Sequence, residues 1–593
     1  MESLGASLKT RGTEFRVWAP HCRTVEVLLE GHAPVPLQAD TGLFAGLVPD
    51  ARAGSRYRYR LDGQRDRPDP VSRYQPDGVH GPSMVVDPRD FSWTDGAFRG
   101  HALEALVIYE LHVGTFTEPG TFEAVIPRLA ALADLGVTAI ELMPVAEFPG
   151  SRNWGYDGVH LYAPQSTYGG PRGLRRLVDA CHAAGLSVIL DVVYNHLGPE
   201  GNYLAEFGPY FTDRHTTPWG LGINVDGADA AGVRRHLVDN ARYWAREFHV
   251  DGLRLDAIHA IADTSPLHIL TELAEAAREE AMTLGRPLHV IAESHDNDRR
   301  IVLPPAEGGL GLDAVWSDDF HHALHTRLTG ERGGYYADYP GGRGLERAIV
   351  EGFAYQGEPS VYWNRNRGTP SADLPGERFV ISLQNHDQVG NRSGSERLPT
   401  LVSPEAVRAA VAILFVTPAI PLLFMGEEYG ETAPFAFFAS FLDPRLSEAV
   451  HRGRQGEFER LGWTGRIADP NDLATLTRAR LNHALATGPG HRELREYYRA
   501  WLRLRRSHPA LGARHKGATH AEMSDDVLVV SRRAPLGERV VLVANLASEH
   551  RPLPRALAGA TALLDSAEPR FAGAGGEPLA PYRAILFEIA RSQ

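Results

Sequence analysis

The chain has 593 residues, of which 43% are hydrophobic, and it carries a net charge of −13. A chain of this length divides into several domains, and its apolar content excludes wholesale disorder. The acidic balance disfavours nucleic acid or an anionic membrane as the main partner, so a neutral substrate fits the chain better.

Cysteine content and apolar patterning indicate the compartment. The two cysteines, Cys22 and Cys181, lie far apart in sequence, which excludes a disulfide framework and fits a reducing compartment. The first residues lack the basic and apolar regions of a signal peptide. Prolines interrupt the most apolar stretch, residues 410–426, which is short for a membrane span. We therefore expect a cytoplasmic protein with no membrane partner.

The first hundred residues show the two-residue period of β-strands. Apolar residues alternate with polar ones around Phe15 and Val17, around Val25 and Val27, and around Tyr57. Proline and glycine separate these runs. The pattern predicts a small β-sandwich over residues 1–100.

From about residue 105, short apolar strands alternate with helical patterns, which is typical of a (β/α)8 barrel. The expected strands are 107–111, 139–143, 187–193, 252–256, 289–292, 314–317, 379–383 and 420–424. Helical patterns between them include 122–135, 174–184, 234–247 and 270–278. The barrel is expected over residues 101–510, longer than the usual ~250 residues because of insertions at 197–233, 329–377 and 430–485.

The last part of the chain returns to a β pattern. A closing amphipathic helix is expected at 493–506, and strands at 527–531, 539–545 and 585–589. Residues 511–593 are thus predicted to form a C-terminal β domain. The fold class is multidomain α/β, a barrel flanked by two β domains.

Four barrel strands end in polar segments that contain acids: residues 191–196 (DVVYNH), 252–256 (GLRLD), 291–294 (IAES) and 384–387 (QNHD). The carboxyl ends of parallel barrel strands meet at one face, where such enzymes place their active sites. Convergent acids without an accompanying metal cluster suggest cleavage of a glycosidic bond. We predict no metal and no cofactor.

Two of the acids have contrasting surroundings. Arg254 shares a strand face with Asp256, so it favours the ionised carboxylate that nucleophilic attack needs. Glu293 ends an apolar strand without a neighbouring cation, a setting that keeps a proton for general acid catalysis. Taken alone, the first could be a structural ion pair and the second a solvated glutamate.

Histidines and aromatic residues near these strand ends supply candidate substrate contacts. His196 and His386 could donate hydrogen bonds to sugar hydroxyls or to a carboxylate. Aromatic side chains in polar loops, namely Trp154, Tyr156, Trp219, Tyr335, Tyr336 and Trp363, are candidates for stacking on sugar rings. The helical pattern with His321 and His325 has the spacing of a zinc helix but no glutamate between them, which favours a helix near the cleft rim.

Together the four segments resemble the signature regions of the α-amylase superfamily of glycoside hydrolases, and residues 153–159 (NWGYDGV) resemble its segment after the second strand. The resemblance implies that Asp256 is the nucleophile, Glu293 the acid/base and Asp387 a carboxylate that grips sugar hydroxyls. Arg254, His196, His386 and Tyr156 would be supporting contacts. Asn195, which helps to hold calcium in many α-amylases, is present, but the insertion after His196 is short, and no required calcium is expected.

Flanking sequences narrow the resemblance. Residues 248–259, 318–322, 334–339, 383–392 and 426–429 are similar to those of superfamily members that release trehalose from a capped glucan. The resemblance implies a retaining hydrolase that cleaves the α-1,4 bond next to the trehalosyl end of an oligosaccharide. Trp219 and the segment 335–339, which includes Tyr336, are candidates for recognising that end. Alternatives are a glucan branching enzyme, in which a sugar hydroxyl replaces water, and a non-catalytic carbohydrate-binding scaffold on the same fold.

Overall fold

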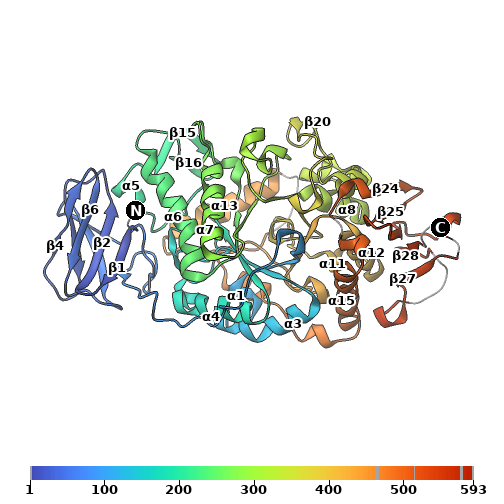
Figure 1. Ribbon diagram of the computed structural model, residues 1–593, viewed down its shortest axis with the longest axis horizontal. Helices are drawn as coiled ribbons and strands as arrows, with labels where there is room; N and C mark the ends of the chain where they lie inside the picture. The colour runs from blue at the N-terminus through green and yellow to red at the C-terminus, as the bar shows by residue number, and fades with distance from the viewer. Residues whose placement is uncertain (1–2, 461–466, 513, 558, 574–578, 590–593) are drawn as a thin grey trace.

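The structure is a computed structural model that describes residues 3–460, 467–512, 514–557, 559–573 and 579–589. Residues 1 and 2, which entered the expectation about a signal peptide, and residues 461–466 of the third insertion lie outside the described residues. Figure 1 shows a β-sandwich, a central barrel and a second β domain following one another along the long axis. In the described part of the chain, no helix has the length and apolar character needed to cross a membrane.

The N-terminal part is a sandwich of two antiparallel sheets. One sheet runs β1 (Gly5–Lys9), β2 (Gly12–Trp18), β6 (Leu43–Val48), β5 (Gln38–Asp40). The other runs β4 (Val35–Pro36), β3 (Val25–Leu29), β7 (Arg56–Leu61), β8 (Arg65–Arg67), with β9 (Ser83–Met84) paired to β7. Phe15 and Tyr57 meet edge to face at 4.8 Å between ring centroids, and alternate side chains of β2 and β7 are buried. The predicted sandwich is confirmed.

Eight parallel strands close the central barrel, as predicted. They are β10 (Ile108–Leu111), β11 (Ala139–Leu142), β14 (Ser187–Val192), β17 (Gly252–Leu255), β18 (His289–Ala292), β19 (Ala314–Trp316), β22 (Phe379–Ser382) and β23 (Ile420–Phe424). Pairing of β10 with β23 closes the ring. The barrel floor is apolar, with Ile108, Ala139, Ile189 and Ile291 in one buried cluster. Because side chains on one strand face recur every second residue, the next inward positions carry acids.

Helices surround the barrel: α1 (Val113–Phe116), α2 (Phe122–Val125), α3 (Leu129–Leu135), α4 (Gly170–Ala183), α5 (Leu204–Phe207), α6 (Ala230–Phe248), α7 (Ile269–Leu284), α8 (Asp318–Thr329), α9 (Leu345–Glu351), α10 (His386–Gly390), α11 (Leu398–Leu401), α12 (Pro404–Val416) and α15 (His491–Ser507). The helix expected at 122–135 is interrupted by a 3-10 turn at Ile126–Arg128. Pro127 explains the interruption, since proline lacks the amide that a continuous helix requires.

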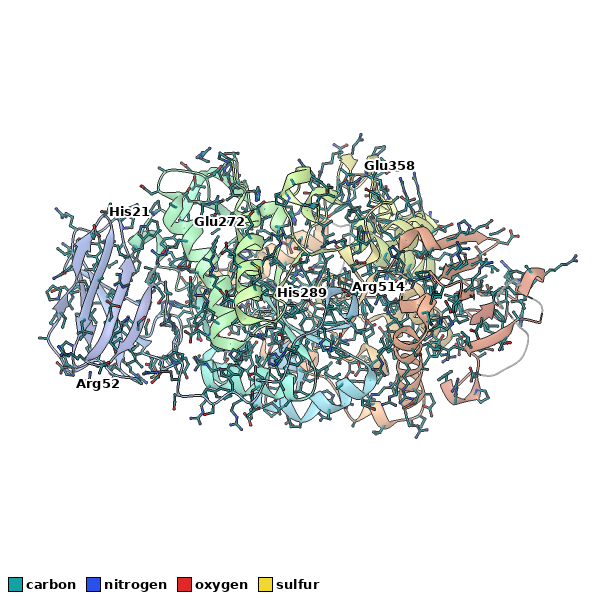
Figure 2. All side chains as sticks on the ribbon, in the orientation of Figure 1. His21, Arg52, Glu272, His289, Glu358 and Arg514 are labelled. Atoms are coloured by element: carbon teal, nitrogen blue, oxygen red, sulfur yellow. The ribbon has the colours of Figure 1, made fainter. Side chains whose placement is uncertain are left out.

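The insertions carry small elements at the mouth of the barrel. The first insertion forms the hairpin β15 (Phe211–Thr217) and β16 (Gly220–Ile223), and the second forms the hairpin β20 (Glu358–Ser360) and β21 (Arg365–Arg367). The third contains α13 (Pro444–Arg460) and α14 (Leu473–Ala479), and β12 (Ala146–Glu147) pairs with β13 (His160–Pro164) nearer the start. Figure 1 shows β15, β16 and β20 along one edge of the barrel, where Figure 2 places Glu358.

The C-terminal β domain is one antiparallel sheet. Its strand order is β24 (Thr519–Ser524), β25 (Val527–Arg533), β26 (Arg539–Asn545), β28 (Ala584–Ile589), β27 (Thr561–Asp565), and α16 (Pro509–Gly512) precedes it. Three of these strands are predicted from the sequence, whereas β24 and β27 are not. β24 alternates buried or half-buried with exposed residues and carries few large apolar side chains, so the sequence signal for that strand is weak.

Candidate active site

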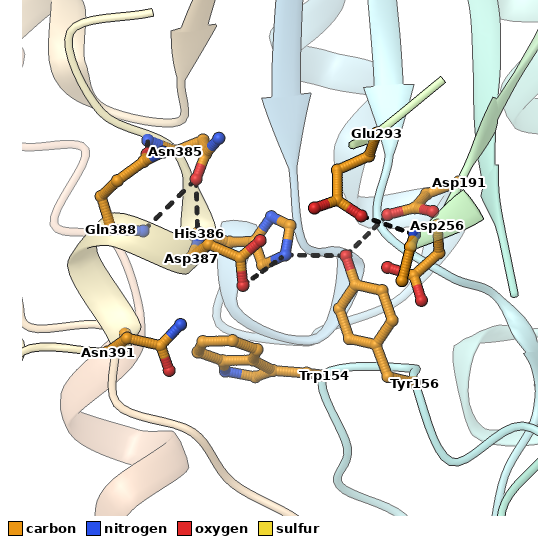
Figure 3. A network of polar contacts seen from close by, with 12 residues as sticks. Trp154, Tyr156, Asp191, Asp256, Glu293, Asn385, His386, Asp387, Gln388 and Asn391 are labelled. Atoms are coloured by element: carbon orange, nitrogen blue, oxygen red, sulfur yellow. Dashed lines mark hydrogen bonds and ion pairs between the residues drawn. The ribbon is translucent and has the colours of Figure 1, made fainter. Parts of the chain in front are cut away.

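Three predicted acids reach one cavity from the ends of three segments. Asp256 directly follows β17, Glu293 directly follows β18, and Asp387 lies in the first turn of α10, after β22. All three line a cavity of about 360 Å³, which we call the inner chamber. Asp256 and Asp387 also border a wider cavity of about 1020 Å³, which we call the outer groove. Figure 3 shows the side chains of the three acids together with neighbouring polar residues.

Two donors hold the carboxylate of Asp256. Arg254 Nη1 donates to Oδ1 at 2.9 Å, and Asn195 Nδ2 donates to Oδ2 at 2.7 Å. Arg254 is fully buried, also donates to Asp191, and lies 4.2 Å from the centre of the Trp316 ring. Charge-assisted hydrogen bonds of this kind fix the orientation of the carboxylate. Asn195 thus serves Asp256.

Glu293 is in a different electrostatic setting. Its side chain is 16% exposed, and burial raises its pKa to about 8, against the opposing charge of Arg254 and with the support of Asp256 and Asp387. The amide of Ala257 donates to Oε2 at 2.5 Å. Ala257 has φ 40°, in the left-handed region that is unfavourable for a residue with a side chain. This backbone strain aims an amide at Glu293 directly beside Asp256.

Tyr156 and His386 link Asp191 to Asp387 (Figure 3). The Tyr156 hydroxyl donates to Asp191 at 2.6 Å and lies 2.8 Å from His386 Nε2. Because the hydroxyl has one hydrogen, His386 must donate to it. His386 Nδ1 faces Glu110 at 2.5 Å, so both ring nitrogens donate and the imidazole is charged. Burial opposes that charge, but Asp387 and Glu110 raise the pKa of His386 to about 9.

Asp387 is oriented by a capping box on α10. Asn385 accepts hydrogen bonds from the amides of Asp387 and Gln388, and the Gln388 side chain accepts from the Asn385 amide. Gln388 also donates to Asp318 at 3.0 Å. The Asp387 side chain remains 43% exposed. It therefore faces the cavity with its oxygens available to a ligand.

His196 and Trp219 form one wall of the outer groove. Their rings stack at 4.6 Å and 16°, and His196 Nδ1 lies 2.6 Å from the side-chain oxygen of Asn195. Trp219 is 51% exposed at the turn between β15 and β16. This large exposed aromatic surface beside the acids is suited to a sugar ring.

The structure corrects the prediction for Tyr336. This residue is 1% exposed, its hydroxyl lies 3.0 Å from His321 Nε2, and its ring stacks on His325 at 4.6 Å. Tyr336 packs inside the protein and borders neither the inner chamber nor the outer groove. Its neighbour Tyr335 borders both. Direct contact of Tyr336 with a sugar is therefore excluded.

Sequence reasoning also overlooked acids inside the barrel. Glu110 pairs with His386, and Glu141 is fully buried with neither carboxyl oxygen in a hydrogen bond. Burial holds the pKa of Glu141 well above its ordinary value. The signal was present, since each is a lone acid within an apolar strand. His295, Asp318 and Trp363 also line the inner chamber.

The site does not contain an obvious metal cage. Within the described residues, no three His, Cys, Asp or Glu side chains are placed to hold a metal ion. His321 faces the backbone oxygen of Leu383, and His325 faces Glu331 at 2.9 Å. These histidines lie on α8 and serve internal contacts.

Comparison with known proteins places the chain in a family. Residues 85–216 match the alpha amylase catalytic domain, residues 3–80 match carbohydrate-binding module 48 (isoamylase N-terminal domain), and residues 516–586 match a domain of unknown function. A crystal structure from Salmonella typhimurium named as an alpha amylase has a TM-score of 0.91 and 39% identity, with 100% of each chain covered.

The curated relatives narrow the family further. A 1,4-alpha-glucan branching enzyme of Corynebacterium jeikeium is 29% identical, over 72% of this chain and 62% of its own length. A malto-oligosyltrehalose trehalohydrolase of Saccharolobus solfataricus is 45% identical over 507 residues, 85% of this chain and 87% of the relative. Such identity over most of both chains decides the assignment: the chain is a glycoside hydrolase that belongs to the malto-oligosyltrehalose trehalohydrolase family of the α-amylase superfamily.

Proposed function

We propose that the chain hydrolyses the α-1,4 bond next to the trehalosyl end of a malto-oligosyltrehalose, releasing trehalose and a malto-oligosaccharide with retained anomeric configuration. The observation that carries the proposal is the contrast between two acids of one cavity. Asp256 is held by Arg254 and Asn195, while burial raises the pKa of Glu293 to about 8. One is suited to attack and the other to proton donation.

In the first step, Glu293 donates its proton to the oxygen of the bond to be broken. Asp256 attacks the anomeric carbon of the glucose unit on the other side of that bond, and trehalose leaves. In the second step, Glu293 removes a proton from water, which attacks the same carbon and releases Asp256. Two successive displacements at one carbon retain its configuration.

The neighbouring residues stabilise this sequence. Arg254 and Asn195 hold Asp256 in line, and the exposed oxygens of Asp387 are available to grip hydroxyls of the reacting glucose. The ring of Tyr156 borders the outer groove. The charged His386 is 1% exposed and borders neither cavity, so the structure corrects its predicted contact with the substrate: it supports Tyr156 and Asp387 instead. His196 and Trp219 extend the contact along the outer groove. Because these groups are already held in place, they need not reorganise when the transition state forms.

We propose three domains, residues 1–100, 101–510 and 511–593. The sandwich strands end at Met84, the barrel begins with β10 at Ile108, and the C-terminal sheet begins with β24 at Thr519. We also propose a cytoplasmic location, supported by Cys22 and Cys181, which are both free and buried.

A matched pair of substrates tests the function. A linear malto-oligosaccharide and its trehalose-capped counterpart of equal length are incubated with the protein, and NMR identifies the products and their anomers. We expect free trehalose and an α-anomeric malto-oligosaccharide, with much faster cleavage of the capped substrate. Equal cleavage of both would contradict the proposal. New α-1,6 linkages from amylose without reducing-end release would instead indicate a branching enzyme.

A further inference from the structure

The cleft has two unequal parts that meet at the acids. Asp256 and Asp387 border both parts, Glu293 borders only the inner chamber, and Tyr156 and His196 border only the outer groove. A general acid must touch the oxygen of the leaving group. If the proposed function holds, the leaving trehalose therefore occupies the inner chamber, and the glucan chain follows the outer groove. The chamber volume of about 360 Å³ suits a disaccharide better than a long chain.

One turn stands at the boundary between the two parts. Residues 361–364, which we call the boundary turn, connect β20 to β21. Trp363 borders both the inner chamber and the outer groove. One face of its ring stacks on His295 at 4.0 Å and 9°, and His295 in turn lies 3.8 Å from His259. The indole is thus a fixed wall, backed by rings from the loops after β17 and β18.

Hydrogen bonds to Asp338 hold the boundary turn in place. Its Oδ1 accepts hydrogen bonds from the amides of Val361 at 2.7 Å and Tyr362 at 3.1 Å, and its Oδ2 accepts from the Ser360 hydroxyl at 2.5 Å. The Trp363 amide then donates to the oxygen of Ser360 at 2.9 Å. Asp338 is 2% exposed and both its oxygens have protein donors, so it positions the turn.

We propose that the boundary turn, positioned by Asp338, is the element that distinguishes a trehalosyl leaving group from a maltosyl one. A trehalosyl unit joins two anomeric carbons, so its terminal ring has a different direction from that of a maltosyl unit and no free anomeric hydroxyl. A rigid aromatic wall at the chamber entrance accepts one of these shapes and obstructs the other. Selection by such a wall raises kcat/KM for one substrate without changing the acids.

The test measures kcat/KM for a capped and a linear substrate of equal length. Trp363→Ala is expected to lower the capped-to-linear ratio about 10-fold, because the capped substrate loses a contact and the linear substrate is no longer obstructed. Asp338→Ala is expected to act in the same direction, and Asp338→Asn, which keeps an oxygen for the two amides, to restore most of the ratio. Val361→Ala is the matched control, because this side chain is 78% exposed and borders neither part of the cleft.

Three outcomes separate the possibilities. A wild-type ratio near one contradicts the proposed function itself. A high wild-type ratio that stays unchanged in Trp363→Ala and Asp338→Ala overturns the role of the boundary turn alone. Equal losses on both substrates also overturn it, because the turn would then support catalysis in general. Melting temperatures show whether each variant folds. If Trp363→Ala does not fold, Trp363→Leu takes its place.

Discussion

Replacing Glu293 with glutamine should slow catalysis strongly and stabilise the protein at neutral pH. Burial raises the pKa of Glu293 from 4.5 to about 8. Between these two values the unfolded chain releases this proton while the folded protein keeps it. The stability that the raised pKa contributes is therefore fully present below pH 4.5 and is lost as the pH rises towards 8. Glutamine is neutral at every pH and keeps an oxygen for the Ala257 amide.

The size of the effect follows from the shift. One pKa unit corresponds to about 1.4 kcal/mol. At pH 7 the pH exceeds the ordinary pKa of 4.5 by about 2.5 units, which gives an upper bound of about 3 kcal/mol for the stabilisation. Water reaches 16% of the side chain, so we expect about 1–3 kcal/mol. Removing the general acid should lower turnover about 10²–10⁴-fold.

The assay compares thermal melts of the wild type and Glu293→Gln at pH 5 and pH 7.5. The pH dependence of kcat/KM is measured for the wild type. The variant should gain stability at pH 7.5 and little at pH 5, and wild-type kcat/KM should fall above about pH 8. Glu307→Gln, at an exposed glutamate, is the control and should show no pH-dependent gain. An equal gain in stability at both pH values would refute the reasoning. So would a wild-type kcat/KM that already falls as the pH rises through about 5.

Three further substitutions test the surrounding network. Asp256→Ala should lower turnover of the capped substrate by about 10⁴-fold; a variant that kept a tenth of the wild-type rate would contradict its role as nucleophile. His386→Phe leaves the Glu110 carboxylate buried without its partner, so urea unfolding should show a loss of about 3–5 kcal/mol, and a loss below 1 kcal/mol would contradict the importance of this pair for stability. Glu141→Gln should raise the free energy of unfolding more at pH 7 than at pH 5, because burial makes the folded protein keep a proton that the unfolded chain releases; a loss above 3 kcal/mol at pH 7 would show the carboxyl to be ionised.

The barrel and the positions of its acids could be predicted from the sequence because parallel strands are buried on both faces. Strands buried on both faces appear as continuous apolar runs, and each of the eight runs becomes a strand of the closed barrel. Asp256 and Glu293 stand directly where two of those runs stop. The position of an acid relative to the end of its strand is a local property, so sequence alone predicts it.

Contacts between residues far apart in the chain, and the direction of individual side chains, could not be predicted from the sequence. Tyr335 and Tyr336 lie in the 3-10 helix Gly334–Asp338, where successive side chains point in different directions, and nothing in the sequence says which one faces the cleft. Trp363 meets His295 through folding of the second insertion. Such a contact depends on tertiary packing, which leaves no periodic trace.

Charge balance explains how the site selects one proton donor. Glu110 and Asp191 share the cations His386 and Arg254 with the acids of the cleft, which leaves other carboxyl groups without a full counter-charge. In a buried layer those groups lower their free energy by keeping a proton. Glu141 is closed off within the barrel, whereas Glu293 borders the inner chamber. Of these two residues, only Glu293 can pass its proton to a substrate. The surplus of buried acids in the barrel is therefore one reason why Glu293 remains protonated at neutral pH.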